Sequence, residues 1–440
     1  MTQPHKSHMT HIAISGAGLS GRAAYQCAQN LGIPCVIDDD VMTEHEAIAA
    51  QDFIKWQTWD FSKYDALILS PGIAHNHPGP HPVAQAARAA DVEIISEVEF
   101  GLRTGQWGKF VVITGTNGKS TTTALTAHLL KTGGAKVAVG GNLGTPLCAL
   151  NEAEKDGITV VELSSYQLET TPSLAPDIAA LLNITPDHLD RHGGLEGYIA
   201  AKMKSLSACH KDSLALIGDE GAIMHRVLDD ARQKLACTIT AISANSLGER
   251  VLDNPALAGA HNAQNAAFAV AIAQACGIDD AAIDAGLASF EGLAHRLQPV
   301  GMMGAMRFVN DSKATNGDAS AKALSAYQDI IWLAGGRAKA DGLTACLPYF
   351  HHVARAYFYG ECANAFFDEA KAHMPCSVHE TLDEAFAQAM TETSDNNVIL
   401  LSPAAASFDQ FPNFGTRGAH FTQLANRYIT AQTREVSHVG

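Results

Sequence analysis

Apolar residues along this chain gather in short runs, and most of these runs end in polar or glycine-rich stretches. Runs of this length that are rich in Val, Ile and Leu are typical of strands buried in a parallel sheet. They lie at 11–14, 35–37, 66–69, 111–113, 137–141, 158–161, 179–184, 306–309, 330–334, 356–359 and 398–401. Stretches of helical length stand between them. This alternation predicts the α/β class, with parallel sheets and right-handed crossover connections.

The sequence GTNGKST at 115–121 follows one of these runs and precedes a predicted helix that runs to about 133. Backbone N–H groups of such a turn, with the helix N-terminus, form a cradle for phosphate. A lysine here reaches the terminal phosphates, and the following hydroxyl holds Mg²⁺. The spacing is compressed, because Ile113 stands where the usual motif has its first glycine. An ordinary glycine turn is the alternative, but the context favours a nucleotide site at Gly115, Thr116, Asn117, Gly118, Lys119, Ser120 and Thr121.

A second glycine turn, Gly16–Gly21, also stands between a strand and a helix, and three aspartates follow the next strand at 38–40. This pattern is typical of dinucleotide-binding oxidoreductases, which makes a nicotinamide-dependent enzyme a rival hypothesis. The pyrophosphate of a UDP-sugar fits the turn equally well. The histidines 75, 77 and 81 would suggest a metal, but the prolines among them favour a surface loop.

Polar residues follow the central strands, where neighbouring parallel strands bring their carboxyl ends together. We therefore expect Lys119, Glu162 and His188 to face one crevice, with Glu162 as a carboxylate for a hard cation. Imidazole suits softer metals, so His188 is either a ligand or a hydrogen-bonding residue. By spacing alone, Lys202 is an ordinary solvated lysine. Asn265 lies near a helix start, where an amide caps the helix or reads a ligand.

The last third repeats this arrangement, with polar stretches at 310–316, 335–339 and 402–411. Lysines and hydroxyls at strand ends suit an anionic substrate such as a carboxylate, although each residue alone is equally typical of a loop or a helix cap. The repetition at several strand ends is the stronger argument.

Composition places the chain in the class of folded globular proteins. Its 440 residues predict about three domains at roughly 150 residues each. The net charge of −16 argues against nucleic acid and anionic membranes as partners. Nine scattered cysteines without a C-x-x-C pair, and no apolar run long enough for a membrane span, predict a cytoplasmic protein with reduced thiols and no membrane insertion. We expect domains at 1–105, 106–294 and 295–440, with a linker at 101–108.

The chain resembles the Mur ligase family over essentially its whole length. The motifs that carry the resemblance are GTNGKST, GGN at 140–142, the Glu162–Leu163–Ser164–Ser165 strand end, TPDHLDRH at 185–192, HNxxN at 261–265, HR at 295–296, DSKATN at 311–316, GG-x-x-K at 335–339 and LSPAAASFDQF at 401–411. DSKATN and SPAAASFDQF point to the branch of the family that adds D-glutamate. The resemblance implies a Rossmann-like N-terminal domain, a central P-loop ATPase-like domain and a Rossmann-like C-terminal domain.

The resemblance also implies a reaction of peptidoglycan synthesis. ATP with Mg²⁺ would phosphorylate the carboxylate of UDP-N-acetylmuramoyl-L-alanine, and the amine of D-glutamate would attack the resulting acyl phosphate. Positioning and cations on the transferred phosphoryl group would stabilise this transfer. A monomer is expected. The alternatives are the oxidoreductase, a sister ligase that adds another amino acid, and a non-catalytic nucleotide-binding regulator.

Residue roles carry over by position from the same resemblance. Lys119, His188, Lys202 and Lys339 would be catalytic, with Lys202 N-carboxylated as in the family. The metal ligands would be Ser120, Glu162, His188 and Lys202. Besides residues 115–121, the nucleotide would contact Asn265, Arg296 and Asp311. The substrates would contact Leu19, Ser20, Ser70, Pro71, Gly72, Asn142, Thr315, Lys339, Ser407 and Phe414. Two departures stand out: Asp38–Asp40 replaces an Asp-Thr-Arg run, and Arg337–Ala338 replaces an Asp-Gly pair.

Overall fold

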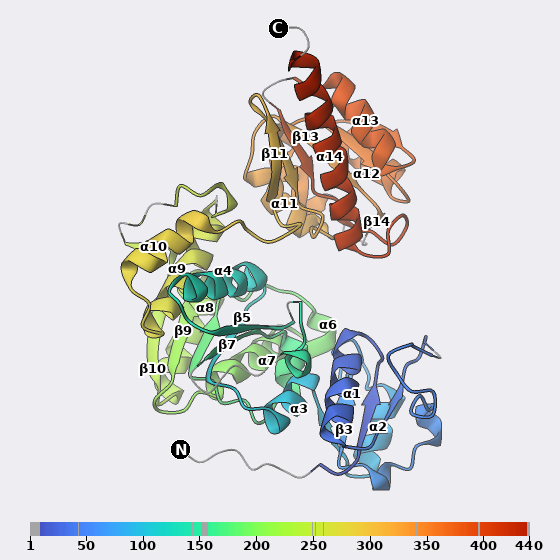
Figure 1. Cartoon of the computed structure of the whole chain (residues 1–440), viewed down its shortest axis with the longest axis vertical. Helices are drawn as coiled ribbons and strands as arrows, with labels where there is room; N and C mark the ends of the chain where they lie inside the picture. The colour runs from blue at the N-terminus through green and yellow to red at the C-terminus, as the bar shows by residue number, and fades with distance from the viewer. Residues whose placement is uncertain are drawn as a thin grey trace. The chain divides into compact units, whose positions relative to one another are not determined.

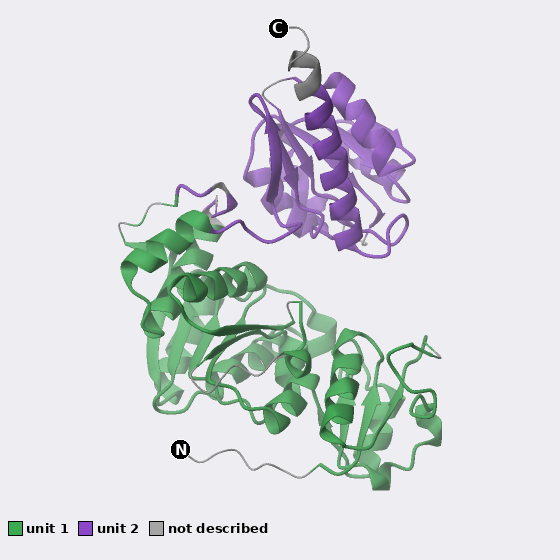
Figure 2. Ribbon diagram, in the orientation of Figure 1, with its two compact units in different colours: residues 1–252, 260–289 green, residues 253–259, 290–440 purple. Residues whose placement is uncertain are grey.

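A computed structural model of the chain describes residues 9–42, 44–142, 144–150, 157–248, 250, 252–257, 259–338, 342–394 and 397–437. They fold into parallel-sheet α/β structure (Figure 1), which confirms the predicted class. The chain divides into two compact units (Figure 2). Unit 1 contains residues 1–252 and 260–289, and unit 2 contains residues 253–259 and 290–440. Each unit is described separately below.

The N-terminal sheet of unit 1 has four parallel strands with helices on both faces. Its order is β2 (Cys35–Asp38), β1 (Ile12–Ser15), β3 (Ala66–Leu69) and β4 (Glu93–Ile95). Its helices are α1 (Leu19–Leu31), α2 (Pro82–Ala89) and α3 (Glu97–Thr104). Successive side chains of β1 point to opposite faces. Ile14 therefore packs in the core under α1, whereas Ala13 packs in the core under α2.

The second sheet of unit 1 has six parallel strands. The order is β10 (Thr238–Ile242), β9 (Leu214–Gly218), β8 (Ile178–Leu181), β5 (Lys109–Thr114), β7 (Ile158–Glu162) and β6 (Val137–Gly141). Its helices are α4 (Lys119–Thr132), α5 (Ser165–Glu169), α6 (Leu189–His192), α7 (Leu195–Ser207), α8 (Ala222–Lys234), α9 (Ala260–Ala275) and α10 (Asp280–Ser289). Because β5 lies between β8 and β7, its carboxyl end has polar strand ends on both sides.

Unit 2 contains a six-stranded sheet in the order β11 (Gln298–Met303), β12 (Met306–Asn310), β17 (Val398–Leu401), β13 (Ile330–Gly335), β15 (Val353–Tyr359) and β16 (Cys376–His379). Only β11 runs antiparallel among these six. The helices are α11 (Gly317–Ser325), α12 (Ala363–Ala370), α13 (Leu382–Glu392) and α14 (Phe414–Ser437). Two short strands, β14 (Arg337–Ala338) and β18 (Ala405–Ala406), pair beyond the sheet.

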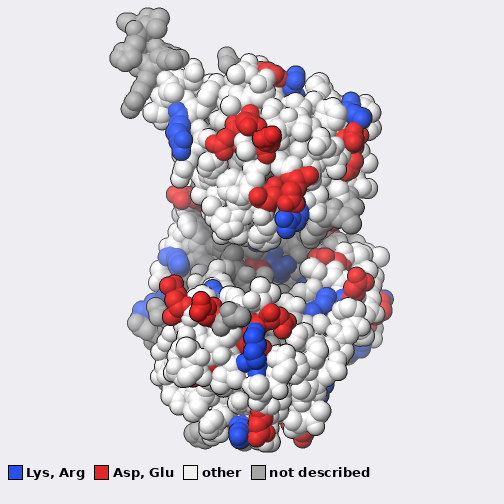
Figure 3. All heavy atoms as spheres, turned by 90° about the vertical axis from the view of Figure 1, so that its right-hand side faces the viewer, with Lys and Arg blue, Asp and Glu red and all other residues white. Residues whose placement is uncertain are grey.

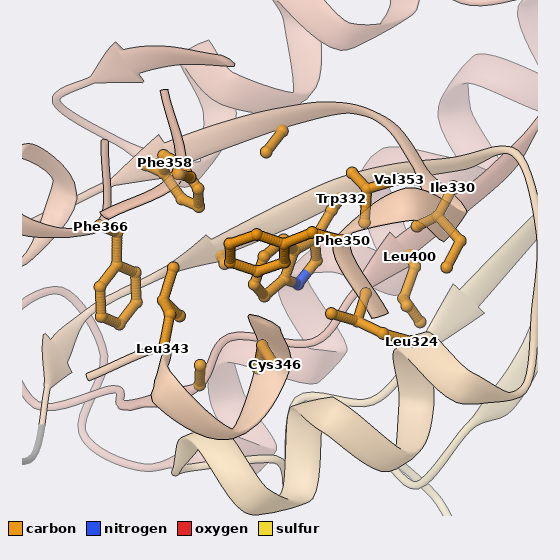
Figure 4. Close-up of a cluster of buried hydrophobic side chains, with 14 of the residues drawn as sticks. Leu324, Ile330, Trp332, Leu343, Cys346, Phe350, Val353, Phe358, Phe366 and Leu400 are labelled. Atoms are coloured by element: carbon orange, nitrogen blue, oxygen red, sulfur yellow. The ribbon is translucent and has the colours of Figure 1, made fainter. Parts of the chain in front are cut away.

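The core of unit 2 gathers around Trp332 on β13 (Figure 4). Its indole is fully buried against aromatic rings such as Phe350 and Phe358, and its Nε1–H donates to the Ser402 carbonyl over 2.8 Å. The indole therefore satisfies its only polar atom while it packs. This bond also connects the core to the loop after β17.

The predicted strands are all present, with ends that shift by a few residues. Sequence reasoning missed β4, β9, β10, β11 and β16. The expected linker at 101–108 is wrong over its first four residues, which belong to α3. Ser96 caps that helix by accepting a hydrogen bond from the Glu99 N–H, and Phe100 is fully buried. The domain boundaries at 105/106 and 294/295 stay a proposal.

Candidate active site

The glycine loop between β5 and α4 is held in shape by Asn183, which follows β8. The N–H of Thr116 donates to the Asn183 carbonyl, and the N–H of Asn117 donates to Asn183 Oδ1, each over 2.9 Å. Gly118 has φ of +81°, and a Cβ there would lie 2.2 Å from Asn265 Oδ1. Only glycine fits such a position. The loop is therefore preorganised at the N-terminus of a 14-residue helix, the geometry that favours an anion.

Lys119 is the first residue of α4, and its side chain folds back over the loop. Its Nζ donates to the carbonyls of Gly115 and Thr116 over 3.0 and 2.9 Å. Ser120 follows on the same helix turn and is buried. The predicted residues 115–121 thus form one continuous loop and helix start.

Glu162 ends β7, next to β5, and its side chain is 1% exposed. Asn142, which follows β6, donates from Nδ2 to Glu162 Oε1 over 2.7 Å and from its N–H to the Glu162 carbonyl over 2.8 Å. Within the described residues, the other carboxylate oxygen, Oε2, has no hydrogen-bond partner. A buried carboxylate oxygen in this state suits a bound cation, because oxygen ligands are what Mg²⁺ prefers.

Lys202 lies on α7 and is 1% exposed, so the expectation of a solvated lysine is wrong. Its Nζ donates to the Gly115 carbonyl over 2.7 Å and stands 4.8 Å from the centre of the Tyr198 ring. Burial and, to a smaller extent, the nearby charge of Lys119 lower the pKa of Lys202 to about 7. The structure thus brings together Lys119 and Lys202 through one carbonyl. Helical spacing could not reveal this, because burial of α7 depends on its packing against the sheet.

His188 differs from these buried residues in its exposure. It adopts a left-handed backbone with φ of +52°, and its side chain is 49% exposed. Its Nε2 lies 3.4 Å from Asp187 Oδ2, and its ring lies 5.2 Å from that of Tyr166. Within the described residues, no three His, Cys, Asp or Glu side chains are grouped to hold a metal ion. The set Ser120, Glu162, His188 and Lys202 stays a prediction.

Asn265 lies inside α9 and is buried beside the glycine loop. Its Oδ1 accepts from Thr122 Oγ1 over 3.3 Å, and its Nδ2 donates to Asn262 Oδ1 over 3.1 Å. These contacts connect α9 with α4 behind the loop. Asn265 is therefore no cap for its own helix.

The N-terminal sheet brings its two predicted loops together. Ser70 Oγ donates to the Gly16 carbonyl over 3.0 Å, and Leu19 is exposed at the start of α1. Asp39 accepts the Ala17 N–H over 2.8 Å, while Asp38 is buried against Lys55 at 3.1 Å. Both aspartates are engaged in internal contacts. This occupies the carboxylates that a dinucleotide-binding site would need for a ribose.

In unit 2, the predicted residues lie on the loops that follow β12 and β17 and at the start of α14. Asp311 Oδ2 accepts from Ser402 Oγ over 2.8 Å, and Oδ1 accepts from the Leu297 N–H over 3.1 Å. Burial raises the pKa of Asp311 to about 7. Lys313 Nζ stands 3.9 Å from the centre of the Phe414 ring. Lys339 lies outside the described residues.

Two family models match the chain, the Mur ligase middle domain at residues 113–252 and the Mur ligase glutamate ligase domain at 295–405. The UDP-N-acetylmuramoylalanine–D-glutamate ligase of Caulobacter vibrioides is 41% identical and covers 94% of this chain and 95% of the relative. The ligase of that name from Rhizobium johnstonii is 39% identical over 93% of each. The chain belongs to the Mur ligase family.

Two solved structures share the fold of this Mur ligase. UDP-N-acetylmuramate-alanine ligase MurC from Thermotoga maritima matches with a TM-score of 0.60 and 19% identity, covering 96% of this chain and all of that one. E. coli FolC, solved in complex with DHPP and ADP, matches with 0.54 and 18%, covering 74% and 90%. The predicted family and fold are confirmed, and the oxidoreductase alternative is not.

Sequence reasoning missed a central residue of this Mur ligase, Arg417. It is fully buried on α14, and it donates to Ser312 Oγ, Ser312 O, Gly335 O and Ala405 O over 2.9–3.2 Å. Ser312 follows β12, Gly335 ends β13 and Ala405 lies on β18, and each is close in sequence to a predicted substrate-binding residue. A single arginine therefore sets the spacing of three predicted substrate loops. Its position in an amphipathic helix carries no signal of this role.

Proposed function

We propose that this Mur ligase joins the amine of D-glutamate to the carboxylate of UDP-N-acetylmuramoyl-L-alanine, with hydrolysis of ATP to ADP and phosphate. The observation that carries the proposal is its relationship to the D-glutamate ligases, which match 93–94% of the chain at 39–41% identity. A match of this extent includes the last third of the chain, where DSKATN and SPAAASFDQF stand.

The glycine loop supplies the binding groups for ATP. The backbone N–H groups at the start of α4 would hold its phosphates, and Lys119 would exchange its two carbonyl contacts for phosphate oxygens. Ser120 and the unpartnered Oε2 of Glu162 would hold Mg²⁺. When bound, Mg²⁺-ATP supplies the phosphoryl group that activates the substrate carboxylate.

Lys202 would serve as a carbamate. Its pKa near 7 leaves a large fraction of its amine neutral at physiological pH, and a neutral amine attacks CO₂. A new N–C bond forms and a proton leaves, so the side chain becomes an anion. A carboxylate-like oxygen at this buried position would hold a second cation with His188.

The remaining predicted residues would bind the two other substrates. Leu19, Ser20 and the turn 70–72 would hold the uridine diphosphate, and Asn142 would contact the muramoyl part. Arg296 and Asp311 would line the adenosine. Thr315, Lys339, Ser407 and Phe414 would hold D-glutamate. We further propose that the protein is cytoplasmic, since ATP and nucleotide-linked sugars are the substrates. We also propose that it is a monomer.

Phosphate release in the presence of ATP, Mg²⁺, UDP-N-acetylmuramoyl-L-alanine and D-glutamate tests the proposal when each component is omitted in turn. We expect release only when all four are present. Replacing D-glutamate with L-lysine or meso-diaminopimelate should abolish it. Equal release without any amino acid would refute the ligase assignment, and release with another amino acid alone would assign a sister activity.

A further inference from the structure

Unit 1 contains a cavity of about 350 Å³ away from the glycine loop, between the N-terminal sheet and helices α5 and α7. His75 and Asn76 line it from the loop after β3, and Arg88 lines it from α2. Glu169 at the end of α5 and Lys204 on α7 form the other side. The volume lies within the range of small-molecule sites.

The walls of this cavity are joined by hydrogen bonds. The Ser96 N–H donates to the Thr170 carbonyl over 2.8 Å, and the Ser96 and Thr171 hydroxyls lie 2.7 Å apart. The Ser173 N–H donates to Glu99 Oε2 over 2.9 Å. These bonds connect β4 and α3 with the segment after α5. The cavity is therefore part of the folded unit and needs no rearrangement to form.

Positive charge gathers around the cavity. Arg88, Arg191 and Lys204 all lie close enough to His75 to lower the pKa of that imidazole, although burial lowers it most and Glu169 opposes them. Within the described residues, none of the three cations forms a salt bridge with a carboxylate. Arg88 donates to Asn76 Oδ1 over 2.7 Å, and Lys204 donates to the Glu169 carbonyl over 2.8 Å. Arg191 donates to two backbone carbonyls.

The single carboxylate of the cavity is already engaged. Glu169 Oε1 lies 3.0 Å from His192 Nδ1, and Oε2 lies 3.7 Å from His75 Nε2. Glu169 is therefore one negative charge that faces two imidazoles. The two cations of the lining, Arg88 and Lys204, outnumber it, which leaves an excess of positive charge. The chain as a whole carries a net charge of −16, and the face in Figure 3 shows basic side chains scattered among acidic ones. A local excess of cations around a concave site is what a small anion needs.

We propose that this cavity binds a small phosphate-bearing anion, held between Arg88 on one wall and Lys204 on the other, with His75 beside it. Arg presents a fork of N–H donors that matches phosphate oxygens, and Lys adds a point charge. Both side chains donate hydrogen bonds to neutral oxygens, and a charged phosphate oxygen would be a stronger acceptor than either. The site is separate from the glycine loop and does not depend on the proposed ligase reaction.

Titration calorimetry with inorganic phosphate on the full chain, without nucleotide or sugar substrate, tests this proposal. We compare wild type with Arg88→Gln/Lys204→Gln and with Arg226→Gln/Lys234→Gln. The control pair removes two exposed cations from α8 of the same unit. A third protein, Lys119→Met, removes the lysine of the glycine loop. Thermal melts establish that all variants are folded, as expected for Arg88, Lys204, Arg226 and Lys234, which are exposed.

We expect the Arg88/Lys204 variant to bind phosphate at least tenfold more weakly than wild type, while the control pair stays within about twofold. Lys119→Met reports separately on phosphate bound at the glycine loop. Equal affinity in wild type and the Arg88/Lys204 variant would overturn the proposal. So would a loss confined to Lys119→Met, because the phosphate would then occupy the glycine loop. Absence of any phosphate binding by wild type would overturn it as well. None of these outcomes bears on whether the ligase reaction occurs.

Discussion

The polar groups of the glycine-loop site in unit 1 and of the substrate loops in unit 2 are satisfied in opposite ways. Glu162 is buried with one oxygen unpartnered, and Lys202 is buried with one carbonyl as its hydrogen-bond acceptor. Arg417 is buried as deeply but donates to four oxygens on three separate segments of the chain. Buried polar groups are normally satisfied, and exceptions concentrate where a ligand completes them. The first region is built to receive charge, and the second is built to hold loops in place.

Lys202→Ala tests the first side of this comparison with the largest expected effect. We expect turnover to fall by about a hundredfold or more, because the buried site loses a group placed beside developing charge. Steady-state phosphate release measures this, and Lys234→Ala, an exposed helical lysine, is the control. Bicarbonate should not rescue the variant. An unchanged rate would remove Lys202 from the reaction.

Glu162→Gln removes the charge but keeps an oxygen for Asn142. We expect the thermal stabilisation of the protein by Mg²⁺-ATP to disappear. The unfolding free energy without ligands should stay within about 1 kcal/mol of wild type, because the oxygen that is replaced accepts no hydrogen bond and the other still accepts from Asn142. Differential scanning fluorimetry with and without Mg²⁺-ATP measures both. A variant that keeps its full response to Mg²⁺-ATP would show that Glu162 is not a metal ligand.

Arg417→Met tests the second side. The substitution removes the donor of four buried oxygens, and each lost hydrogen bond costs about 1 kcal/mol of stability. We therefore expect the unfolding free energy of unit 2 to fall by about 4 kcal/mol. Urea denaturation measures the change, and Arg427→Met, exposed on the same helix, is the control. The KM for D-glutamate should rise as the loops lose their spacing. Equal stability of the two variants would contradict the scaffold role.

Glu97 sharpens the comparison, because it also has an unpartnered buried oxygen but lies away from the loop. Burial raises the pKa of Glu97 from 4.5 to about 7, so the folded state binds more protons than the unfolded state between these values. Unfolding free energy therefore falls as pH rises through that window. We expect Glu97→Gln to gain up to about 3 kcal/mol over wild type at about pH 8, and little at about pH 4.

Chemical denaturation of both proteins at the two pH values measures this difference. The same advantage at both pH values would mean that Glu97 does not titrate with folding. The result would separate a buried carboxyl that keeps a proton from Glu162, which is buried at the end of β7.

Motifs that are local in sequence were predicted correctly. The glycine loop 115–118, the strand before it and the helix after it all depend on neighbouring residues, so pattern and propensity suffice. The strand β11 was missed because its burial is incomplete and its pattern is weak. The strand β9 was missed although four of its five residues are buried. The first turns of the expected linker at 101–108 are helical because the Ser96 cap and the buried Phe100 override the glycine at 101.

The amino-acid sequence by itself determined the family, the α/β class and the glycine loop, because each rests on short segments whose order along the chain is enough. The tertiary structure decided which polar residues are buried and what they contact. Lys202 became a desolvated amine with a lowered pKa only when α7 packed on the central sheet. Arg417 reached three loops only when α14 docked on unit 2. Burial and contacts between distant segments arise from packing, which no local pattern of residues records.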